Sequence, residues 1–163
     1  MNITLRNLTD LNKFASKIAR SLKGGEILLL QGELGSGKTT FTKALAKALG
    51  IKKTVVSPTF TLCHTYQISQ PSSPRKRGST PKNWIPDQVR DDVTRVLLHI
   101  DAYRLKTPTE FLHLGALEHL GQPDTITVIE WPEKIKKFLP RQGRMVLQFA
   151  HGEKINERIV ISN

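Results

Sequence analysis

The sequence contains one cysteine, Cys63, in 163 residues, so no disulfide can form within the chain. A lone cysteine is typical of proteins from a reducing compartment, and we expect a cytoplasmic location. Because no other metal-ligating residues cluster around Cys63 in the sequence, we interpret it as a packing residue.

Long apolar runs are also missing. The longest are short, such as ILLL at residues 27–30, whereas a membrane-spanning helix needs about 20 apolar residues. The first ten residues, MNITLRNLTD, lack the apolar core of a secretory signal. We therefore expect neither a membrane span nor an exported protein.

Acidic residues are scarce: 25 lysines and arginines face 14 aspartates and glutamates, which gives a net charge of +11. This balance favours an anionic partner such as a nucleotide, RNA or an acidic protein, although a lysine-rich solvated surface would give the same total. Hydrophobic content of 38% is ordinary for a globular protein, and the length suggests a single domain, residues 1–163.

Hydrophobic periodicity predicts alternating strands and helices. Expected strands cover residues 3–7, 26–32, 54–57, 60–68, 95–101 and 124–130, and expected helices cover 11–22, 38–50, 108–121 and 132–139. Thr9 or Asp10 is the expected cap of the first helix. Segments 143–150 and 156–162 read as a closing hairpin. The pattern favours an α/β layered domain with an antiparallel tail.

The sharpest motif is GELGSGKT at residues 32–39, which matches G-x-x-x-x-G-K-[ST] between an expected strand and an expected helix. Gly32, Gly35 and Gly37 allow backbone angles and close approaches that a Cβ would block. Their N–H groups, with that of Ser36, would then bind phosphate oxygens at the helix N-terminus. Lys38 would reach the β- and γ-phosphates of a nucleotide, and the Thr39 hydroxyl would bind Mg²⁺. Thr40 is either a contact to the α-phosphate or an ordinary helix residue.

Such a loop needs a carboxylate from a neighbouring strand end, and the sequence offers two. TITVIE ends at Glu130 and VLLHID ends at Asp101, both after apolar positions. Either could bind Mg²⁺ or orient the attacking water, and the residues alone do not rank them.

Two further segments carry polar groups near these positions. The hydroxyls of SPTFT, residues 57–61, could sense the γ-phosphate, or the segment could be a proline turn entering a strand. In HIDAYR, positions 99, 101 and 103 share one face of a strand, which indicates either a site or a half-exposed strand end.

In this order, GELGSGKTTF, SPTFTL, HIDAYRL and VIEWPE resemble the TsaE (YjeE) family, bacterial ATPases of tRNA threonylcarbamoyladenosine biosynthesis. The resemblance implies a P-loop NTPase-like, three-layer domain with a mostly parallel central sheet and the antiparallel C-terminal hairpin. It also implies ATP and Mg²⁺ as cofactors and a weak intrinsic ATPase that works with the partner proteins TsaB and TsaD. Contact with tRNA would be indirect, through that complex, and neither a membrane nor DNA is an expected partner.

The resemblance also implies roles for single residues. Thr39 and Glu130 would hold the metal, with Asp101 as the further acidic residue of the site. Ser57 and Thr59 would belong to a nucleotide-responsive segment. The remaining implied positions are Trp131, packed near the site, and Thr9, lining the adenine.

Two other functions stay open at this stage. A small-molecule P-loop kinase would need a lid to exclude water, and a non-enzymatic RNA-binding module would use the positive charge. The lid candidate lies within SQPSSPRKRGSTPKNWIPDQVRDDVTR, residues 69–95. Its text resembles translated palindromic repeat elements, and we predict a surface insertion over residues 70–92.

Overall fold

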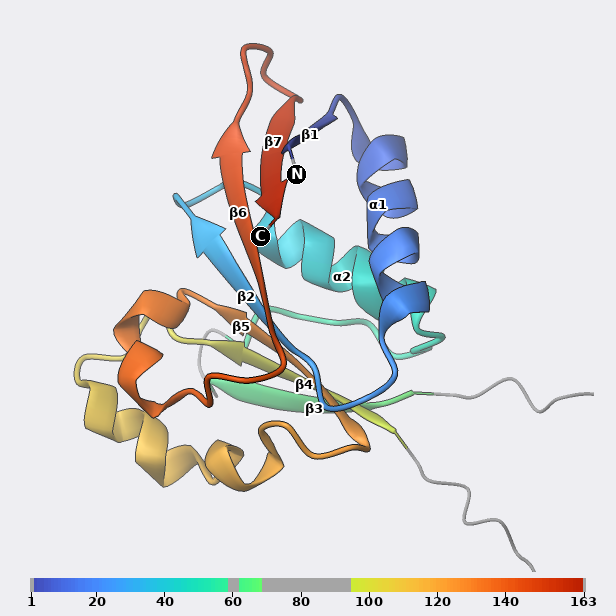
Figure 1. The fold of residues 1–163 in the computed structure, drawn as a ribbon. Coiled ribbons are helices and arrows are strands. Elements are labelled where there is room, and N and C mark those ends of the chain that lie inside the picture. Colours follow the sequence, from blue (N-terminus) through green and yellow to red (C-terminus); the bar gives the residue numbers. More distant parts are fainter. Residues whose placement is uncertain (1, 59–61, 69–94, 163) are drawn as a thin grey trace, which may run out of the picture.

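A computed structural model describes residues 2–58, 62–68 and 95–162 of the chain (Figure 1). Its strands form one seven-stranded sheet in the order β1-β7-β6-β2-β5-β4-β3. The strands are β1 (Asn2–Leu5), β2 (Ile27–Gly32), β3 (Cys63–Gln67), β4 (Val96–Asp101), β5 (Thr125–Glu130), β6 (Arg144–His151) and β7 (Arg158–Ser162). The predicted insertion, residues 70–92, lies outside the described residues.

The centre of the sheet is parallel and its edges are antiparallel. Strand β2 pairs in parallel with β5 and β6, and β5 pairs in parallel with β4. Strands β7, β1 and β3 join in antiparallel pairs. The expected mostly parallel sheet is therefore only partly matched, whereas the C-terminal hairpin β6–β7 is confirmed. The parallel centre brings the ends of β2, β4 and β5 to one edge.

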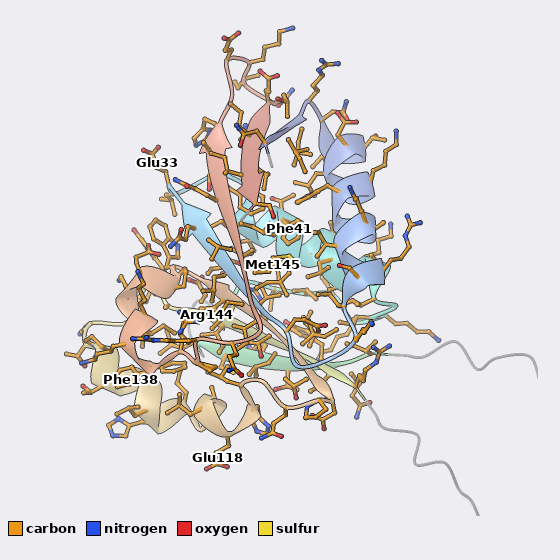
Figure 2. All side chains as sticks on the ribbon, viewed as in Figure 1. Glu33, Phe41, Glu118, Phe138, Arg144 and Met145 are labelled. Carbon is orange, nitrogen blue, oxygen red and sulfur yellow. The ribbon has the colours of Figure 1, made fainter. Side chains whose placement is uncertain are left out.

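Helices α1 (Leu8–Ser21) and α2 (Lys38–Ala48) cover one face of the sheet (Figure 1). The other face is covered by the short 3₁₀ helices η1 (Pro108–Leu114), η2 (Ala116–His119), η3 (Pro132–Lys134) and η4 (Lys136–Phe138). Phe41 of α2 is fully buried in the first layer, and Phe138 packs in the second (Figure 2). Each face of the sheet thus has its own apolar core, and the fold is a three-layer α/β domain.

Four local predictions were wrong. The single helix expected over 132–139 is split into η3 and η4, with Ile135 between them. Residues 54–57 form no strand. The single helix expected over 108–121 is split into η1 and η2, because Gly115 adopts a left-handed conformation with φ of 64°. Neither Thr9 nor Asp10 caps α1: the N-cap is Asn7, whose side chain accepts a hydrogen bond from the Asp10 amide at 3.0 Å.

Asn7→Ala is expected to lower the free energy of unfolding by about 1 kcal/mol, because it leaves the Asp10 amide without its partner. Thermal and denaturant unfolding of the whole chain would measure this loss. Asn12→Ala is the matched control, since Asn12 is exposed within the same helix and alanine has the higher helix propensity. Equal stability of the two variants would contradict the assigned cap.

No helix in the described part of the chain is long and apolar enough to cross a membrane.

Candidate nucleotide-binding site

The loop between β2 and α2 folds tightly because of its glycines. Gly32 has φ of 133°, and a Cβ there would lie 2.2 Å from the carbonyl oxygen of Phe149. Gly37, the N-cap of α2, has φ of 105°. Residues that carry a side chain rarely adopt either backbone conformation. The glycines of the motif therefore allow a tight loop that leads directly into the N-terminus of α2.

Lys38 lies inside this loop, and only 4% of its surface is exposed. Its ammonium donates to the carbonyl oxygens of Gly32 and Glu33 at 2.8 and 2.7 Å. It also lies 4.2 Å from the centre of the Trp131 ring. Burial lowers the pKa of Lys38, and the nearby carboxylates of Glu130, Glu133 and Asp101 partly oppose that shift. The loop thus holds a positive charge close to its own carbonyls.

Glu130, at the end of β5, meets the start of α2. Its Oε2 accepts a hydrogen bond from the Thr39 hydroxyl at 2.8 Å, and its Oε1 lies 2.9 Å from His99 Nε2. Thr42, one turn further along α2, reaches Oε1 at 3.5 Å. The carboxylate is 2% exposed, so these groups set its orientation.

Asp101, at the end of β4, is paired in register with Glu130. The expectation that both carboxylates lie at one sheet edge is therefore confirmed. Asp101 Oδ2 accepts from the Ser57 hydroxyl at 2.9 Å, and Oδ1 accepts from the Tyr103 amide at 3.0 Å. Asp101 therefore ties Ser57 to the sheet edge.

These groups surround a cavity of about 320 Å³. Lys38, Thr39, Ser57, Asp101 and Glu130 line it together with Leu34, Gly35, Gly37, Thr40, Tyr103, Arg104 and Trp131. Trp131 has a left-handed backbone, with φ of 58°, and its ring lies 5.0 Å from that of Tyr103. The structure thus brings most of the sequence-predicted site residues to one place, whereas Thr59 lies outside the described residues.

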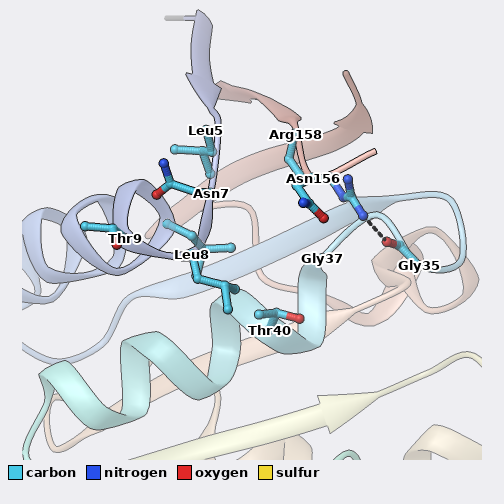
Figure 3. A pocket seen from close by; sticks show the side chains of 10 residues that line it. Leu5, Asn7, Leu8, Thr9, Gly35, Gly37, Thr40, Asn156 and Arg158 are labelled. Carbon is cyan, nitrogen blue, oxygen red and sulfur yellow. Dashed lines mark hydrogen bonds between the residues drawn. The ribbon is translucent and has the colours of Figure 1, made fainter. Parts of the chain in front are cut away.

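A second cavity, of about 480 Å³, shares Gly35, Gly37 and Thr40 with the first. Figure 3 shows its lining residues. Its other lining residues are Leu5, Asn7, Leu8, Thr9, Leu11, Asn156 and Arg158. Thr9 thus lines a cavity that borders the loop, and its expected contact with the adenine stays a prediction.

Arg158 is a residue that the sequence analysis missed. Its guanidinium donates to the carbonyls of Ile155 and Glu157 at 2.9 and 2.8 Å and reaches the Gly35 carbonyl at 3.4 Å (Figure 3). No motif surrounds Arg158 in the sequence. Its place at the loop follows from the pairing of β7 with β1 and β6.

The donor set of the first cavity suits a hard cation, since it consists of a hydroxyl and carboxylates. In the described ranges, no group of three or more histidine, cysteine, aspartate or glutamate residues could hold a metal ion by itself. Thr39 and Glu130 could supply only part of a coordination shell, which fits an ion that binds together with phosphate oxygens.

Comparison with known proteins gives one consistent family. The family model described as threonylcarbamoyl adenosine biosynthesis protein TsaE matches residues 5–75 and 86–160. The unmatched residues between these ranges fall within the predicted insertion, which stays a prediction.

Two relatives and one solved structure illustrate the similarity. TsaE of Rickettsia felis is 34% identical over 84% of this chain and 66% of its own length. TsaE of Bacillus subtilis is 33% identical over 93% of this chain and 78% of its own length. The crystal structure of YdiB from Bacillus subtilis superposes with a TM-score of 0.67 and 27% identity, covering 98% of this chain and 82% of that chain. The chain thus spans slightly under two thirds of the length of the Rickettsia felis relative.

Proposed function

Since the chain belongs to the TsaE family of threonylcarbamoyl adenosine biosynthesis proteins, we propose that it binds and hydrolyses ATP during the formation of threonylcarbamoyladenosine in tRNA. The observation that carries this proposal is the hydrogen bond of 2.8 Å between Thr39 and Glu130 at the mouth of the loop. It brings the hydroxyl of the loop motif together with a carboxylate from a neighbouring strand, the two kinds of group that hold Mg²⁺ on such loops.

The loop residues would hold the phosphates. The helix N-terminus and the loop amides favour an anion, and Lys38 would exchange its bonds to the Gly32 and Glu33 carbonyls for phosphate oxygens. Because Lys38 is nearly buried, water screens its charge less, and its attraction to the phosphate oxygens is stronger. Lys38 would then stabilise the charge that develops on the transferred phosphoryl group.

Mg²⁺ would be held by the Thr39 hydroxyl and by Glu130, directly or through water. When bound, the ion would neutralise charge on the phosphates. Asp101 would position the attacking water. It lies beside Glu130 in the sheet, and its carboxylate accepts a hydrogen bond from the Ser57 hydroxyl at 2.9 Å. Ser57 would in this way couple the water to the SPTFT segment.

The second cavity would take the nucleoside. Aliphatic side chains of Leu5, Leu8 and Leu11 supply apolar walls for a base, and Thr9 and Asn156 add polar groups. Arg158 adds a positive charge between this cavity and the loop, where the ribose and α-phosphate of a bound nucleotide would pass.

Arg158→Ala is expected to weaken ATP and ADP binding about tenfold, which corresponds to about 1.4 kcal/mol. Calorimetric titration with either nucleotide would measure it. Arg141→Ala is the matched control, since it removes the same charge from an exposed position that lines neither cavity. Unchanged affinity in a folded Arg158→Ala variant would rule out this contact.

The partners would be TsaB and TsaD, with tRNA contacted through their complex. Two large apolar side chains at the first cavity are exposed, Leu34 by 70% and Tyr103 by 44%. Their exposure supports a partner protein that covers the mouth of this cavity. A partner that covered them would also exclude water from the phosphates, which strengthens the electrostatic interactions there. Low activity of the isolated chain follows from this arrangement.

The test is ATP hydrolysis by the purified chain, alone and with purified TsaB and TsaD. We expect slow hydrolysis by the chain alone and faster hydrolysis with both partners. An ATPase rate that the partners leave unchanged would contradict the proposed coupling.

A further inference from the structure

His99 is buried within the sheet and is not among the residues that line the first cavity. It lies in β4 between Leu98 and Ile100, and its side chain is 0% exposed. Its register partner in β5 is Val128, two residues before Glu130, so His99 and Glu130 lie on the same face of the sheet. This face is covered by α2.

The hydrogen bond between His99 and Glu130 has one direction. An ionised carboxylate can only accept, so Nε2 is the ring nitrogen that donates, over 2.9 Å, to Oε1. The other ring nitrogen, Nδ1, is buried and has no hydrogen-bond partner among the described residues. Within the part of the chain that the structure describes, the polar contact of the imidazole is therefore the one with Glu130.

The two oxygens of Glu130 thereby receive separate partners. Oε1 faces the core, where His99 is at 2.9 Å and Thr42 is at the longer distance of 3.5 Å. Oε2 faces the phosphate loop, where it accepts from Thr39. Without His99, the long contact from Thr42 is what the described residues would still offer Oε1, and the carboxylate could rotate.

A purely structural role explains this arrangement poorly. Burying a polar ring with one unpaired nitrogen destabilises a core relative to an apolar side chain of similar size. Its neighbours along β4 include Leu97, Leu98 and Ile100, which are apolar and buried. The feature that an apolar residue could not supply is the bond to Glu130.

We propose that His99 is a positioning residue that fixes Glu130 Oε1, so that Oε2 is presented to Thr39 and to the divalent cation of the nucleotide complex. This inference rests on the proposed function. His99 touches neither nucleotide nor metal, and it acts only through the carboxylate. Removing it is therefore expected to weaken the response to Mg²⁺ and to leave metal-free nucleotide binding intact.

His99→Gln and His99→Asn both keep a polar side chain, so comparing them isolates the effect of the hydrogen bond to Glu130. In His99→Gln the amide nitrogen can reach the place of Nε2, whereas in His99→Asn the shorter amide falls near Nδ1 and cannot bridge to Glu130. His99→Leu removes all polar atoms. Thr127→Val is the control for disturbing the core. Thr127 is also buried, and its hydroxyl has no hydrogen-bond partner in the described ranges, but it lies three residues from Glu130 and hence on the opposite face.

The experiment titrates each variant of the full chain with ADP by calorimetry, in EDTA and at increasing Mg²⁺ concentrations. Loss of a partner that orients a metal ligand typically weakens metal affinity about 10- to 100-fold. We expect His99→Asn and His99→Leu to need that much more Mg²⁺, with ADP affinity in EDTA changed less than about twofold. His99→Gln and Thr127→Val are expected to behave as the wild type does.

The outcomes distinguish failure of the His99 role from failure of the proposed function. A wild-type chain whose ADP affinity ignores Mg²⁺ would contradict the metal site itself. If the wild type responds to Mg²⁺ and His99→Asn responds equally, the role of His99 is overturned and the proposed function is not. If His99→Leu does not fold, the Gln and Asn pair still decides the matter, because equal Mg²⁺ requirements in those two variants would refute the positioning role.

Discussion

Lys38→Ala is expected to slow ATP hydrolysis about 100- to 1,000-fold, the range found when one preorganised donor to transition-state charge is removed. Lys38 lies inside the β2–α2 loop. It is 4% exposed and donates hydrogen bonds to the carbonyl oxygens of Gly32 and Glu33. Alanine would leave both carbonyls facing the phosphates without a positive charge between them. Steady-state hydrolysis with TsaB and TsaD present, and ADP titration, would measure the loss.

Lys43→Ala provides the control for Lys38, because Lys43 lies in the same helix but is exposed. It removes the same charge without touching the loop, so hydrolysis should stay at the wild-type rate. A Lys38→Ala variant that binds and hydrolyses ATP as Lys43→Ala does would show that the loop is not the phosphate site.

Glu130→Gln is expected to reduce Mg²⁺-dependent hydrolysis by about two orders of magnitude or more. The amide keeps the shape of the side chain but loses the negative charge, and one of its two terminal atoms becomes a donor. Either the contact with Thr39 or the contact with His99 must then change, since both groups approach the carboxylate as donors at 2.8 and 2.9 Å. The rate of hydrolysis as a function of Mg²⁺ concentration would measure the effect.

Glu133→Gln is the matched control for Glu130, since Glu133 is exposed three residues later in the chain. It also raises the pKa of Lys38, but less than Glu130 does. Its substitution should therefore leave hydrolysis nearly unchanged. Equal losses in the two variants would point to general negative charge near Lys38 and would exclude a specific role for the Glu130 carboxylate.

The geometry of the β2–α2 loop and of the carboxylate edge could be predicted because their signals are local. Spacing alone places Gly32, Lys38 and Thr39 between a strand and a helix. Apolar runs that end in Asp101 and Glu130 predict two buried parallel strands, and the register confirms that these two residues are neighbours. Both signals depend on backbone geometry over fewer than about ten residues, the scale at which sequence patterns are informative.

What could not be predicted depends on contacts between distant residues. His99 shares a strand face with Asp101 in the sequence pattern, yet it is buried under α2 and contacts Glu130, whereas Asp101 binds Ser57 at the sheet edge. Arg158 reaches Gly35 across 123 positions of sequence. Such pairings follow from the sheet order, which no single segment encodes.

Errors within single elements have a different cause. Segment 108–121 has helical periodicity, but Gly115 takes a positive φ and the chain forms two 3₁₀ turns around it. At the start of α1, three residue types that favour caps stand close together, namely Asn7, Thr9 and Asp10. Only the structure shows that Asn7 has the extended backbone that a cap requires.

We propose that this chain supports tRNA modification through ATP hydrolysis at the Lys38 loop. The most direct measurement is the number of threonylcarbamoyladenosines formed per TsaB–TsaD complex, with this chain and ATP present. Catalytic amounts of the complex should modify excess tRNA repeatedly with the wild-type chain and should stop early with Lys38→Ala. Repeated turnover with Lys38→Ala, or without the chain at all, would contradict this role of the Lys38 loop.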